Sequence, residues 1–465
     1  MTKREFENIY FLGIGGIGMS ALARYFLHEG YRVAGYDLTA TPLTRALESE
    51  GAEVHYEDDV ELIPEYMRDA SRTLVVLTPA IPADHKEWAW FREQGFRIEK
   101  RSQMLGVLSE GKCVMAVAGT HGKTTTSTLA AWLNHAAQGE GSAFLGGISR
   151  NFGSNLLLGE GRRLVVEADE YDRSFLRLYP DVAVITATDA DHLDIYGTPE
   201  AMVEAFAEFA SQIKRGGALV LKQGVSLKFD TSERALYRYS CDEGGDFHAE
   251  NIELLEGGYY RYDIVMPDGR IDGCMLGILG KVHIENSIAA VAMLWCAAKI
   301  EGKSLDYDKI REALRGFEGV KRRMEVYLNT PEQVYIDDYA HHPEELRATI
   351  TSLRGIFPGR RLVAVFQPHL YTRTRDFATE FAEVLSMADK VVMVPIYPAR
   401  ELPIEGVNSE LIGKDISVEW ELVERDSVAE YLKTESTDVT VTFGAGNIDV
   451  ICAKVAQVLT DKLTK

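Results

Sequence analysis

The segment 119–126 carries the strongest structural signal in this chain. It reads Gly119-Thr120-His121-Gly122-Lys123-Thr124-Thr125-Thr126 and follows an apolar run, 113–118, that is typical of a buried strand. A helical pattern, 129–135, comes after it. A strand, a tight glycine-containing loop and a helix form the setting in which backbone N–H groups hold phosphates. The segment therefore predicts a nucleoside triphosphate site, in which Lys123 reaches the β- and γ-phosphates and Thr124 ligates Mg²⁺.

The loop departs from the usual pattern G-x-x-x-x-G-K-[ST] at one position. The first glycine of that pattern falls on Val117, and Gly119 stands two residues later. The alternative is a glycine- and threonine-rich turn with a solvated lysine. The order of strand, loop and helix favours the phosphate loop, because such motifs are judged by their context. The shifted glycine indicates a particular branch of the phosphate-loop proteins.

The charge balance limits the classes of partner. The formal net charge is -21 over 465 residues, which opposes extended contact with nucleic acid and gives no basic face for a membrane. Anionic ligands must then be held by local donors and Mg²⁺. The five cysteines are scattered and the charged residues 1–8 lead directly into a strand pattern. We expect reduced thiols, no signal peptide, no membrane insertion and a cytoplasmic monomer or weak homodimer.

Strand and helix patterns alternate along most of the chain. The apolar runs 9–12, 31–36 and 73–77 open it, 163–167 and 182–187 follow the phosphate loop, and 334–337, 362–366, 390–395 and 439–443 close it. A glycine-containing region, 237–273, is interpreted as antiparallel additions. This order predicts an α/β fold with a Rossmann-like N-terminal domain (1–108), a central P-loop ATPase-type domain (109–319) and a C-terminal Rossmann-like domain (320–465). Ligands are expected at the carboxyl ends of the strands.

A second glycine-rich turn follows the first strand. Its glycines are Gly13, Gly15, Gly16 and Gly18, and Asp37 stands at the end of the next strand. This spacing fits the dinucleotide-binding fingerprint and, taken alone, favours an NAD-dependent oxidoreductase. The fingerprint requires only a diphosphate at a helix N-terminus, however, and no later feature requires hydride chemistry. A turn selected for tight packing remains an alternative.

Acidic residues end the two strand patterns that follow the phosphate loop. The first run is Glu167-Ala168-Asp169-Glu170-Tyr171-Asp172, and the second contains Asp191 and His192. Acidic runs are usually solvated loops, but their place at strand ends favours Mg²⁺ ligation, with Glu167 as the first choice. Together Lys123, Thr124, Glu167 and His192 would serve two cations and a transferring γ-phosphoryl group.

Two loops of the third domain combine histidine with arginine or aspartate. One reads Asp337-Asp338-Tyr339-Ala340-His341-His342-Pro343, and the other runs from Gln367 to Arg375. Arg373 and Arg375 are suited to a carboxylate or a phosphate. A zinc site built from His341, His342 and His369 is a competing interpretation. Adjacent histidines rarely point at one ion, and no thiolate lies nearby in the sequence.

Taken together, these segments resemble the Mur ligases, the ATP-dependent amide-bond enzymes of peptidoglycan precursor synthesis. The resemblance covers essentially the whole chain and rests on the phosphate loop, E-A-D-E, D-H-L-D-I-Y-G, the segment 280–286, R-x-E at 323–325 and D-Y-A-H-H-P. The N-terminal glycines, R-S-Q-M-L at 101–105 and the segment 369–375 are most similar to the branch that attaches L-alanine to UDP-N-acetylmuramate. Phe206 stands where several later-acting members carry a carbamylated lysine, which favours the same branch.

The resemblance implies a role for each candidate residue. ATP would be held by Gly119, Thr120, His121, Gly122, Lys123, Thr124 and Thr125, with Asn286 at the adenine and Arg323 and Asp338 at phosphate and ribose. Mg²⁺, as two ions, would be held by Thr124, Glu167 and His192. The amino acid and the acceptor carboxylate would be placed by Tyr339, His341, His369, Arg373 and Arg375. The UDP part of UDP-N-acetylmuramate would be received by Gly13, Gly15, Gly16, Gly18 and Asp37. Lys123, His192, His341 and Arg373 would be the catalytic residues.

The chain departs from the family pattern at four positions. Tyr171 and Arg173 replace a common serine and glycine, His283 replaces a common asparagine, and Leu370 replaces a common arginine. Leu370 cannot supply a guanidinium, so Arg373 or Arg375 must recognise any carboxylate. The nearest alternative function is a murein-peptide ligase, which attaches a recycled tripeptide to the same acceptor. A non-catalytic nucleotide-binding switch is a third alternative, besides the oxidoreductase.

Overall fold

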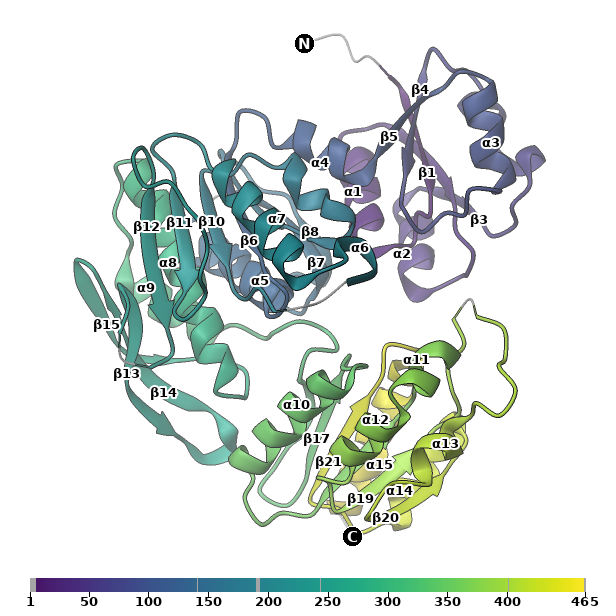
Figure 1. The fold of residues 1–465 in the computed structure, drawn as a ribbon, viewed down its shortest axis with the longest axis vertical. Helices are drawn as coiled ribbons and strands as arrows, with labels where there is room; N and C mark the ends of the chain where they lie inside the picture. Colours follow the sequence, from purple (N-terminus) through teal and green to yellow (C-terminus); the bar gives the residue numbers. More distant parts are fainter. Residues whose placement is uncertain (1–5, 140, 190–192, 243, 400, 464–465) are drawn as a thin grey trace. The chain divides into compact units, whose positions relative to one another are not determined.

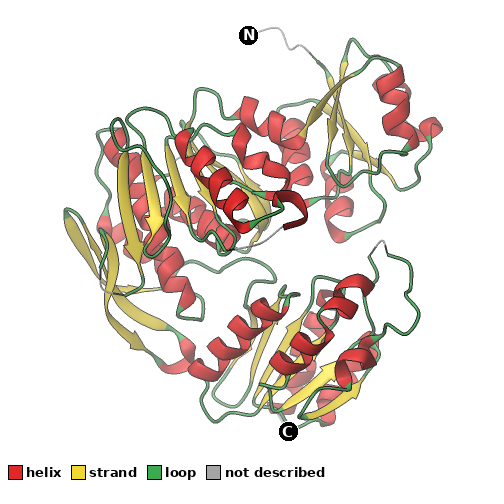
Figure 2. Cartoon of the chain, viewed as in Figure 1, coloured by secondary structure: helices red, strands yellow, loops and turns green. Residues whose placement is uncertain are grey.

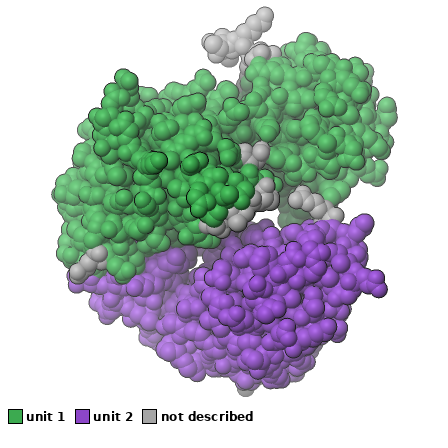
Figure 3. Space-filling model, viewed as in Figure 1, with its two compact units in different colours: residues 1–250, 263–274, 285–317 green, residues 251–262, 275–284, 318–465 purple. Residues whose placement is uncertain are grey.

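The computed structural model describes residues 6–139, 141–189, 193–242, 244–399 and 401–463. The chain divides into two compact units, which Figure 3 colours separately. Unit 1 comprises Met1–Glu250, Asp263–Cys274 and Glu285–Phe317, and unit 2 comprises Asn251–Tyr262, Met275–Ile284 and Glu318–Lys465. The described residues form three sheets with alternating helices (Figures 1 and 2), as the sequence predicts.

The first sheet lies in unit 1 and has the predicted Rossmann-like character. Its order is β3-β2-β1-β4-β5, and all four pairs of neighbouring strands are parallel. The strands are β1 (Asn8–Leu12), β2 (Arg32–Tyr36), β3 (Glu53–His55), β4 (Thr73–Leu77) and β5 (Arg97–Lys100), with helices α1 (Ile17–His28), α2 (Pro42–Glu50), α3 (Lys86–Glu93) and α4 (Arg101–Leu108). Strand order reverses between β1 and β4, and such a reversal opens a ligand crevice at the carboxyl ends.

The second sheet places the phosphate loop at its centre. Its order is β15-β14-β13-β12-β11-β10-β6-β9-β7-β8, and β6 pairs in parallel with both β9 and β10. The strands are β6 (Cys113–Ala118), β7 (Ser142–Ser149), β8 (Ser154–Leu157), β9 (Arg163–Glu167), β10 (Val182–Ile185), β11 (Ala218–Lys222), β12 (Ala235–Ser240), β13 (Phe247–Leu254), β14 (Tyr260–Met266) and β15 (Gly269–Met275). The helices are α5 (Lys123–Leu133), α6 (Leu193–Tyr196), α7 (Pro199–Ser211), α8 (Val282–Ile300) and α9 (Tyr307–Arg315). The carboxyl ends of β9 and β10 therefore flank the loop that follows β6.

Two expectations about this sheet need correction. Helix α5 begins at Lys123, six residues before the predicted pattern. The pattern missed this first turn because its three threonines have low helix propensity. The region 237–273 is not simply an antiparallel addition. Strand β12 pairs in parallel with β11, and its last two residues pair in parallel with the start of β13. Alternation of apolar residues does not distinguish the two directions of pairing.

The third sheet lies in unit 2 and is again mostly parallel. Its order is β16-β17-β21-β18-β19-β20, with β16 antiparallel to β17. The strands are β16 (Glu325–Asn329), β17 (Val334–Asp338), β18 (Leu362–Phe366), β19 (Lys390–Met393), β20 (Glu419–Leu422) and β21 (Val439–Phe443). The helices are α10 (Pro343–Ile356), α11 (Tyr371–Asp376), α12 (Ala378–Leu385), α13 (Ser409–Gly413), α14 (Val428–Thr434) and α15 (Cys452–Leu463). The loops 339–342 and 367–370 both leave carboxyl ends of this sheet.

One apolar core connects the first two sheets inside unit 1. Helix α1 packs against β7 and β8, and Phe26 and Phe144 belong to the same buried cluster. At this contact the Asn155 amide donates to the Ser20 hydroxyl at 3.0 Å. The first glycine-rich turn and the phosphate loop are therefore parts of one packed body. Among the described helices, none is both long enough and apolar enough to cross a membrane.

Candidate active site

The phosphate loop can be built only with glycine at two positions. Gly119 has a φ of +129°, and a Cβ there would lie 2.2 Å from the Thr186 hydroxyl. Gly122 has a φ of +78° and stands at the N-cap of α5. Both backbones are left-handed, which side chains disfavour. The Thr120 hydroxyl is buried and has no hydrogen-bond partner among the described residues. A tight loop with an orphan donor before a helix N-terminus fits a phosphate.

Lys123 and Thr124 each contact a carboxylate from the loop after β9. The Lys123 ammonium donates to the Gly119 carbonyl and to Glu170 Oε1, both at 2.7 Å. The Thr124 hydroxyl donates to Glu167 Oε1 at 3.0 Å. The adjacent Thr124 hydroxyl and Glu167 carboxylate supply hard oxygen ligands, which are the kind that Mg²⁺ prefers. The structure thus brings together Lys123, Thr124 and Glu167, while His192 lies outside the described residues.

The predicted ATP residues Asn286, Thr125 and His121, all in unit 1, lie in or against the same loop. Asn286, on α8, lies against it, because a Cβ on Gly122 would be 3.0 Å from Asn286 Oδ1. The Thr126 hydroxyl also approaches that oxygen, at 3.3 Å. Thr125 is buried in the first turn of α5. His121 is exposed, with Nε2 3.7 Å from Asp189. The chain thus brings Asn286 to a loop that lies about 160 positions earlier in the sequence.

The N-terminal glycines shape the turn between β1 and α1. Gly13 has a φ of +86°, and Gly16 is the N-cap of α1. The amide of Gly15 donates to Asp37 Oδ2 at 2.7 Å. Asp37 stands at the end of β2, as predicted, and its carboxylate braces the glycine turn. A helix that starts at such a turn offers free N–H groups to a diphosphate.

Arg101 is a functional candidate that the sequence patterns did not single out. Its guanidinium lies so close to Gly18 that a Cβ there would be 2.4 Å from Nη1. It also approaches Asp169 Oδ2, at 3.4 Å. A guanidinium beside a helix N-terminus is well placed for a diphosphate. The signal available in the sequence was only the family-like segment R-S-Q-M-L, which gave Arg101 no role.

In unit 2, Asp338 ends β17 as a buried carboxyl group. Burial raises the pKa of Asp338 from its ordinary value of 3.8 to about 6, although a hydrogen bond from Thr349 opposes the rise. The Thr349 hydroxyl donates to Asp338 Oδ2 at 2.5 Å. A buried carboxyl group with few partners costs stability, which is common where a group serves a ligand.

Two arginines and a histidine gather around Tyr339. The guanidinium groups of Arg322 and Arg323 lie 5.3 and 5.2 Å from its ring centroid. The ring of His341 meets it edge to face at 5.3 Å. Burial lowers the pKa of His341, with Glu345 opposing the change and Arg373 adding to it. His341 is therefore predominantly neutral near pH 7.

The loop after β18 carries His369 and Arg373 next to this group. The rings of His341 and His369 are 6.2 Å apart, and Arg373 Nη1 lies 3.3 Å from His369 Nδ1. Leu370 has a φ of +71°, which is rare for a branched side chain and marks backbone strain. Arg375 instead pairs with Asp376 at 2.7 Å and is exposed. The structure therefore groups Tyr339, His341, His369 and Arg373 and leaves Arg375 outside their contacts.

The alternative zinc site has no support in the described residues. The ring of His342 packs against Phe377, with centroids 4.7 Å apart, rather than toward His341 and His369. No group of three or more histidine, cysteine or acidic residues in the described part of the chain is arranged to hold a metal.

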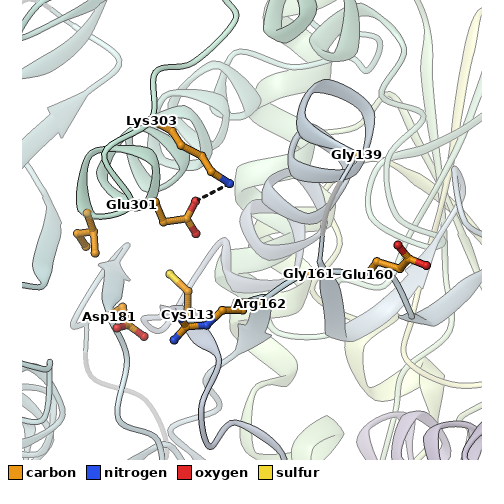
Figure 4. Close-up of a pocket in the computed structure, with 9 residues that line it drawn as sticks. Cys113, Gly139, Glu160, Gly161, Arg162, Asp181, Glu301 and Lys303 are labelled. Atoms are coloured by element: carbon orange, nitrogen blue, oxygen red, sulfur yellow. Dashed lines mark ion pairs between the residues drawn. The ribbon is translucent and has the colours of Figure 1, made fainter.

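A separate cavity lies at the amino end of β6, away from the phosphate loop at its carboxyl end. It has a volume of about 670 Å³ and is lined by Cys113, Arg162, Asp181, Glu301 and Lys303, among others. Figure 4 shows Glu301 paired with Lys303, at 3.3 Å. Cys113 begins β6, whereas the phosphate loop follows its end. This cavity is therefore no part of the phosphate site.

Known proteins match this sequence over nearly its whole length. The sequence matches the Mur ligase family catalytic domain over residues 8–112, the Mur ligase middle domain over 117–294 and the Mur ligase glutamate ligase domain over 322–446. It is 47% identical to UDP-N-acetylmuramate--L-alanine ligase of Phocaeicola vulgatus, covering 99% of this chain and 100% of that protein. The identity to the enzyme of the same name from Porphyromonas gingivalis is 46%, covering 97% and 99%.

Solved structures agree with the sequence matches. The UDP-N-acetylmuramate-alanine ligase of Thermotoga maritima superimposes with a TM-score of 0.80 at 26% identity, over 98% of this chain and 100% of that one. A murein peptide ligase from Psychrobacter arcticus, at 23% identity and a TM-score of 0.67 over 97% and 98% of the chains, shares the fold. With three successive domains matched in order, this chain belongs to the Mur ligase family.

Proposed function

We propose that this chain is an ATP-dependent ligase that joins L-alanine to the lactyl carboxylate of UDP-N-acetylmuramate. The observation that carries the proposal is the convergence of Lys123, Thr124 and Glu167 at the carboxyl ends of β6 and β9. Relatives over the full length, at 42–47% identity, bear the name of this activity. We further propose domain boundaries at 108/109 and 319/320, a cytoplasmic location and a monomer or weak homodimer.

The first domain would bind the sugar nucleotide. The start of α1 offers N–H groups after Gly16, and Arg101 supplies positive charge beside Gly18. A diphosphate needs both backbone donors and a countercharge in a protein of net charge -21. The Asp37 carboxylate stabilises the glycine turn by accepting a hydrogen bond from the Gly15 amide, so its contribution to UDP binding is partly indirect.

The phosphate loop would hold ATP with its γ-phosphate toward Lys123. Thr124 and Glu167, with His192 as a further proposed ligand, would hold Mg²⁺, which neutralises charge on the transferring phosphoryl group when bound. The lactyl carboxylate attacks the γ-phosphorus and ADP leaves. An amine does not displace oxygen from a free carboxylate, because oxide is a poor leaving group. Phosphoryl transfer converts one carboxylate oxygen into part of a phosphate leaving group. Lys123 would stabilise the charge that develops on the equatorial oxygens.

The group around Tyr339 would handle the amino acid. Arg373 is suited to the L-alanine carboxylate through paired N–H donors, since Leu370 offers no guanidinium. The neutral ring of His341 can accept the proton that the amine loses. The free amine attacks the acyl phosphate carbon, and the tetrahedral intermediate expels inorganic phosphate as the amide forms. Arg323 and Asp338 are proposed to contact ATP phosphate and ribose.

The proposal is tested by phosphate release from ATP with UDP-N-acetylmuramate and a panel of amines. L-alanine should give the highest kcat/KM, above glycine, L-serine and the murein tripeptide. A higher kcat/KM with the tripeptide would favour the murein-peptide alternative instead. Binding of NAD, with no product from any amine, would favour the oxidoreductase alternative.

A further inference from the structure

The Lys123 ammonium is held at two of its three donor positions. It donates to the Gly119 carbonyl and to Glu170 Oε1, both at 2.7 Å, and these are the acceptors it contacts among the described residues. An ammonium has three N–H donors. One donor is therefore left for a phosphate oxygen, and the direction of the side chain is fixed by the other two.

Glu170 is an unusual partner because its side chain is completely buried. Its exposed fraction is 0%, whereas Lys123 remains 15% exposed. Burying a carboxylate is costly unless a charge pairs with it. Burial raises the pKa of Glu170, and Lys123 opposes that rise. The Glu170 carboxylate therefore loses its hydration in the folded protein, and the ion pair with Lys123 offsets part of that cost.

The backbone of Glu170 is fixed by a second segment of the chain. The hydroxyl of Tyr196, a buried residue on α6, donates to the Glu170 carbonyl at 2.6 Å. The guanidinium of Arg173 lies 5.4 Å from the ring centroid of Tyr196. Arg173 itself has a φ of +53°, a left-handed backbone that non-glycine residues rarely adopt. The contact with Tyr196 gives a reason for arginine at a position whose backbone suits glycine.

We propose that Glu170 is a positioning residue that holds Lys123 for the γ-phosphate, and that Tyr196 and Arg173 fix Glu170 in turn. This inference rests on the proposed function, because it assigns the held lysine to phosphoryl transfer. Glu170 acts through Lys123 and does not touch the substrate. Loss of Glu170 should therefore weaken the interaction with the γ-phosphate and leave the binding of the rest of the nucleotide unchanged.

Glu170→Gln tests the inference, because it keeps the shape and removes the charge. Charge-assisted hydrogen bonds are roughly twice as strong as neutral ones, so kcat should fall about 10- to 100-fold. The Kd for a non-hydrolysable imido analogue of ATP should rise. The Kd for ADP, which lacks the γ-phosphate, and the Kd for UDP-N-acetylmuramate should each stay within about twofold of wild type. A Glu170→Asp variant, with charge but a shorter reach, should recover part of kcat.

Tyr196→Phe tests the support of Glu170. Loss of one hydrogen bond should lower kcat about fivefold with unchanged ADP binding. Tyr179→Phe is the matched control, since Tyr179 is exposed and, among the described residues, makes no hydrogen bond to Glu170, Lys123 or Tyr196. Arg173→Gly removes the contact with Tyr196 but places glycine at a left-handed position, where it is unstrained. Because relief of strain offsets the lost contact, kcat should fall less than in Tyr196→Phe.

Three outcomes would overturn the inference. The first is a wild-type kcat in Glu170→Gln. The second is a parallel loss of affinity for ADP and UDP-N-acetylmuramate, which would make Glu170 a structural residue. The third is full rescue of Glu170→Gln by higher Mg²⁺, which would make Glu170 a metal ligand. In each case wild-type protein still forms product, so the proposed function stands, whereas absence of product in wild type overturns that function itself.

Discussion

Replacing Asp338 by asparagine should make unit 2 more stable while it impairs the proposed ATP site. Asp338 is 5% exposed, and its carboxyl group accepts hydrogen bonds from the Thr349 hydroxyl at 2.5 Å and from the Ala340 amide at 3.4 Å. Burial raises the pKa of Asp338 from 3.8 to about 6 in the folded protein. The charged form is therefore destabilised by folding, and a neutral side chain of the same shape avoids that cost.

The magnitude follows from the size of the pKa change. A rise of about two units corresponds to about 3 kcal/mol. The cost is absent well below pH 3.8, where the carboxyl is protonated in both states, and complete above about pH 6. Asparagine keeps the acceptor for Thr349 but loses the long bond from Ala340, which costs about 1 kcal/mol. A net gain of about 2 kcal/mol is expected near neutral pH.

The assay is chemical unfolding of wild type and Asp338→Asn from about pH 4.5 to about pH 7.5, followed with a signal from unit 2. The free-energy difference between the two proteins should grow by about 2 kcal/mol over that range. Asp415→Asn, at an exposed position of the same unit, should show a flat difference. A flat difference for Asp338→Asn as well would refute the reasoning, because Asp338 would then titrate as an ordinary carboxyl group.

Three further variants probe the other parts of the site. Arg101→Ala should raise the KM for UDP-N-acetylmuramate by about 10- to 100-fold in steady-state assays, with kcat little changed, if Arg101 binds the diphosphate. Gly119→Ala should abolish ATP binding in calorimetry, because its Cβ would meet Thr186 at 2.2 Å; Gly111→Ala, also at positive φ but in open space, should lose only about 1 kcal/mol and keep ATP binding. The acidic limb of the pH profile of kcat/KM for L-alanine should have an apparent pKa below 6.5 and should disappear in His341→Gln, whereas an unchanged limb would remove His341 from proton transfer.

The fold was largely predictable because its strands are short, apolar and separated by turn residues. Strands β4, β6, β9, β18 and β21 have the predicted bounds, and β1, β2 and β17 differ from theirs by one residue at an end. Pairing direction was harder, since β12 joins β11 in parallel where an antiparallel addition was expected. A pattern of apolar residues fixes which side of a strand is buried but says nothing about its neighbour.

The site was predictable where one loop carries all of it. The phosphate loop is recognisable in the sequence because its glycines, its lysine and its threonine, each with a distinct role, lie within eight residues. Contacts between distant segments were not visible in the same way. Nothing in the acidic run distinguishes Glu170, which pairs with Lys123, from Asp169, which approaches Arg101. Tertiary packing alone assigns those partners, and the assignment of ligands to the individual residues stays a prediction.

In the proposed reaction, the γ-phosphoryl group of ATP is transferred to the lactyl carboxylate before the amide forms. UDP-N-acetylmuramate labelled with ¹⁸O in that carboxylate tests it directly, with L-alanine as the amine and mass spectrometry of the released phosphate. One ¹⁸O should appear in each phosphate, because the bridging oxygen of the acyl phosphate leaves with phosphorus. Product formed with unlabelled phosphate would contradict the mechanism.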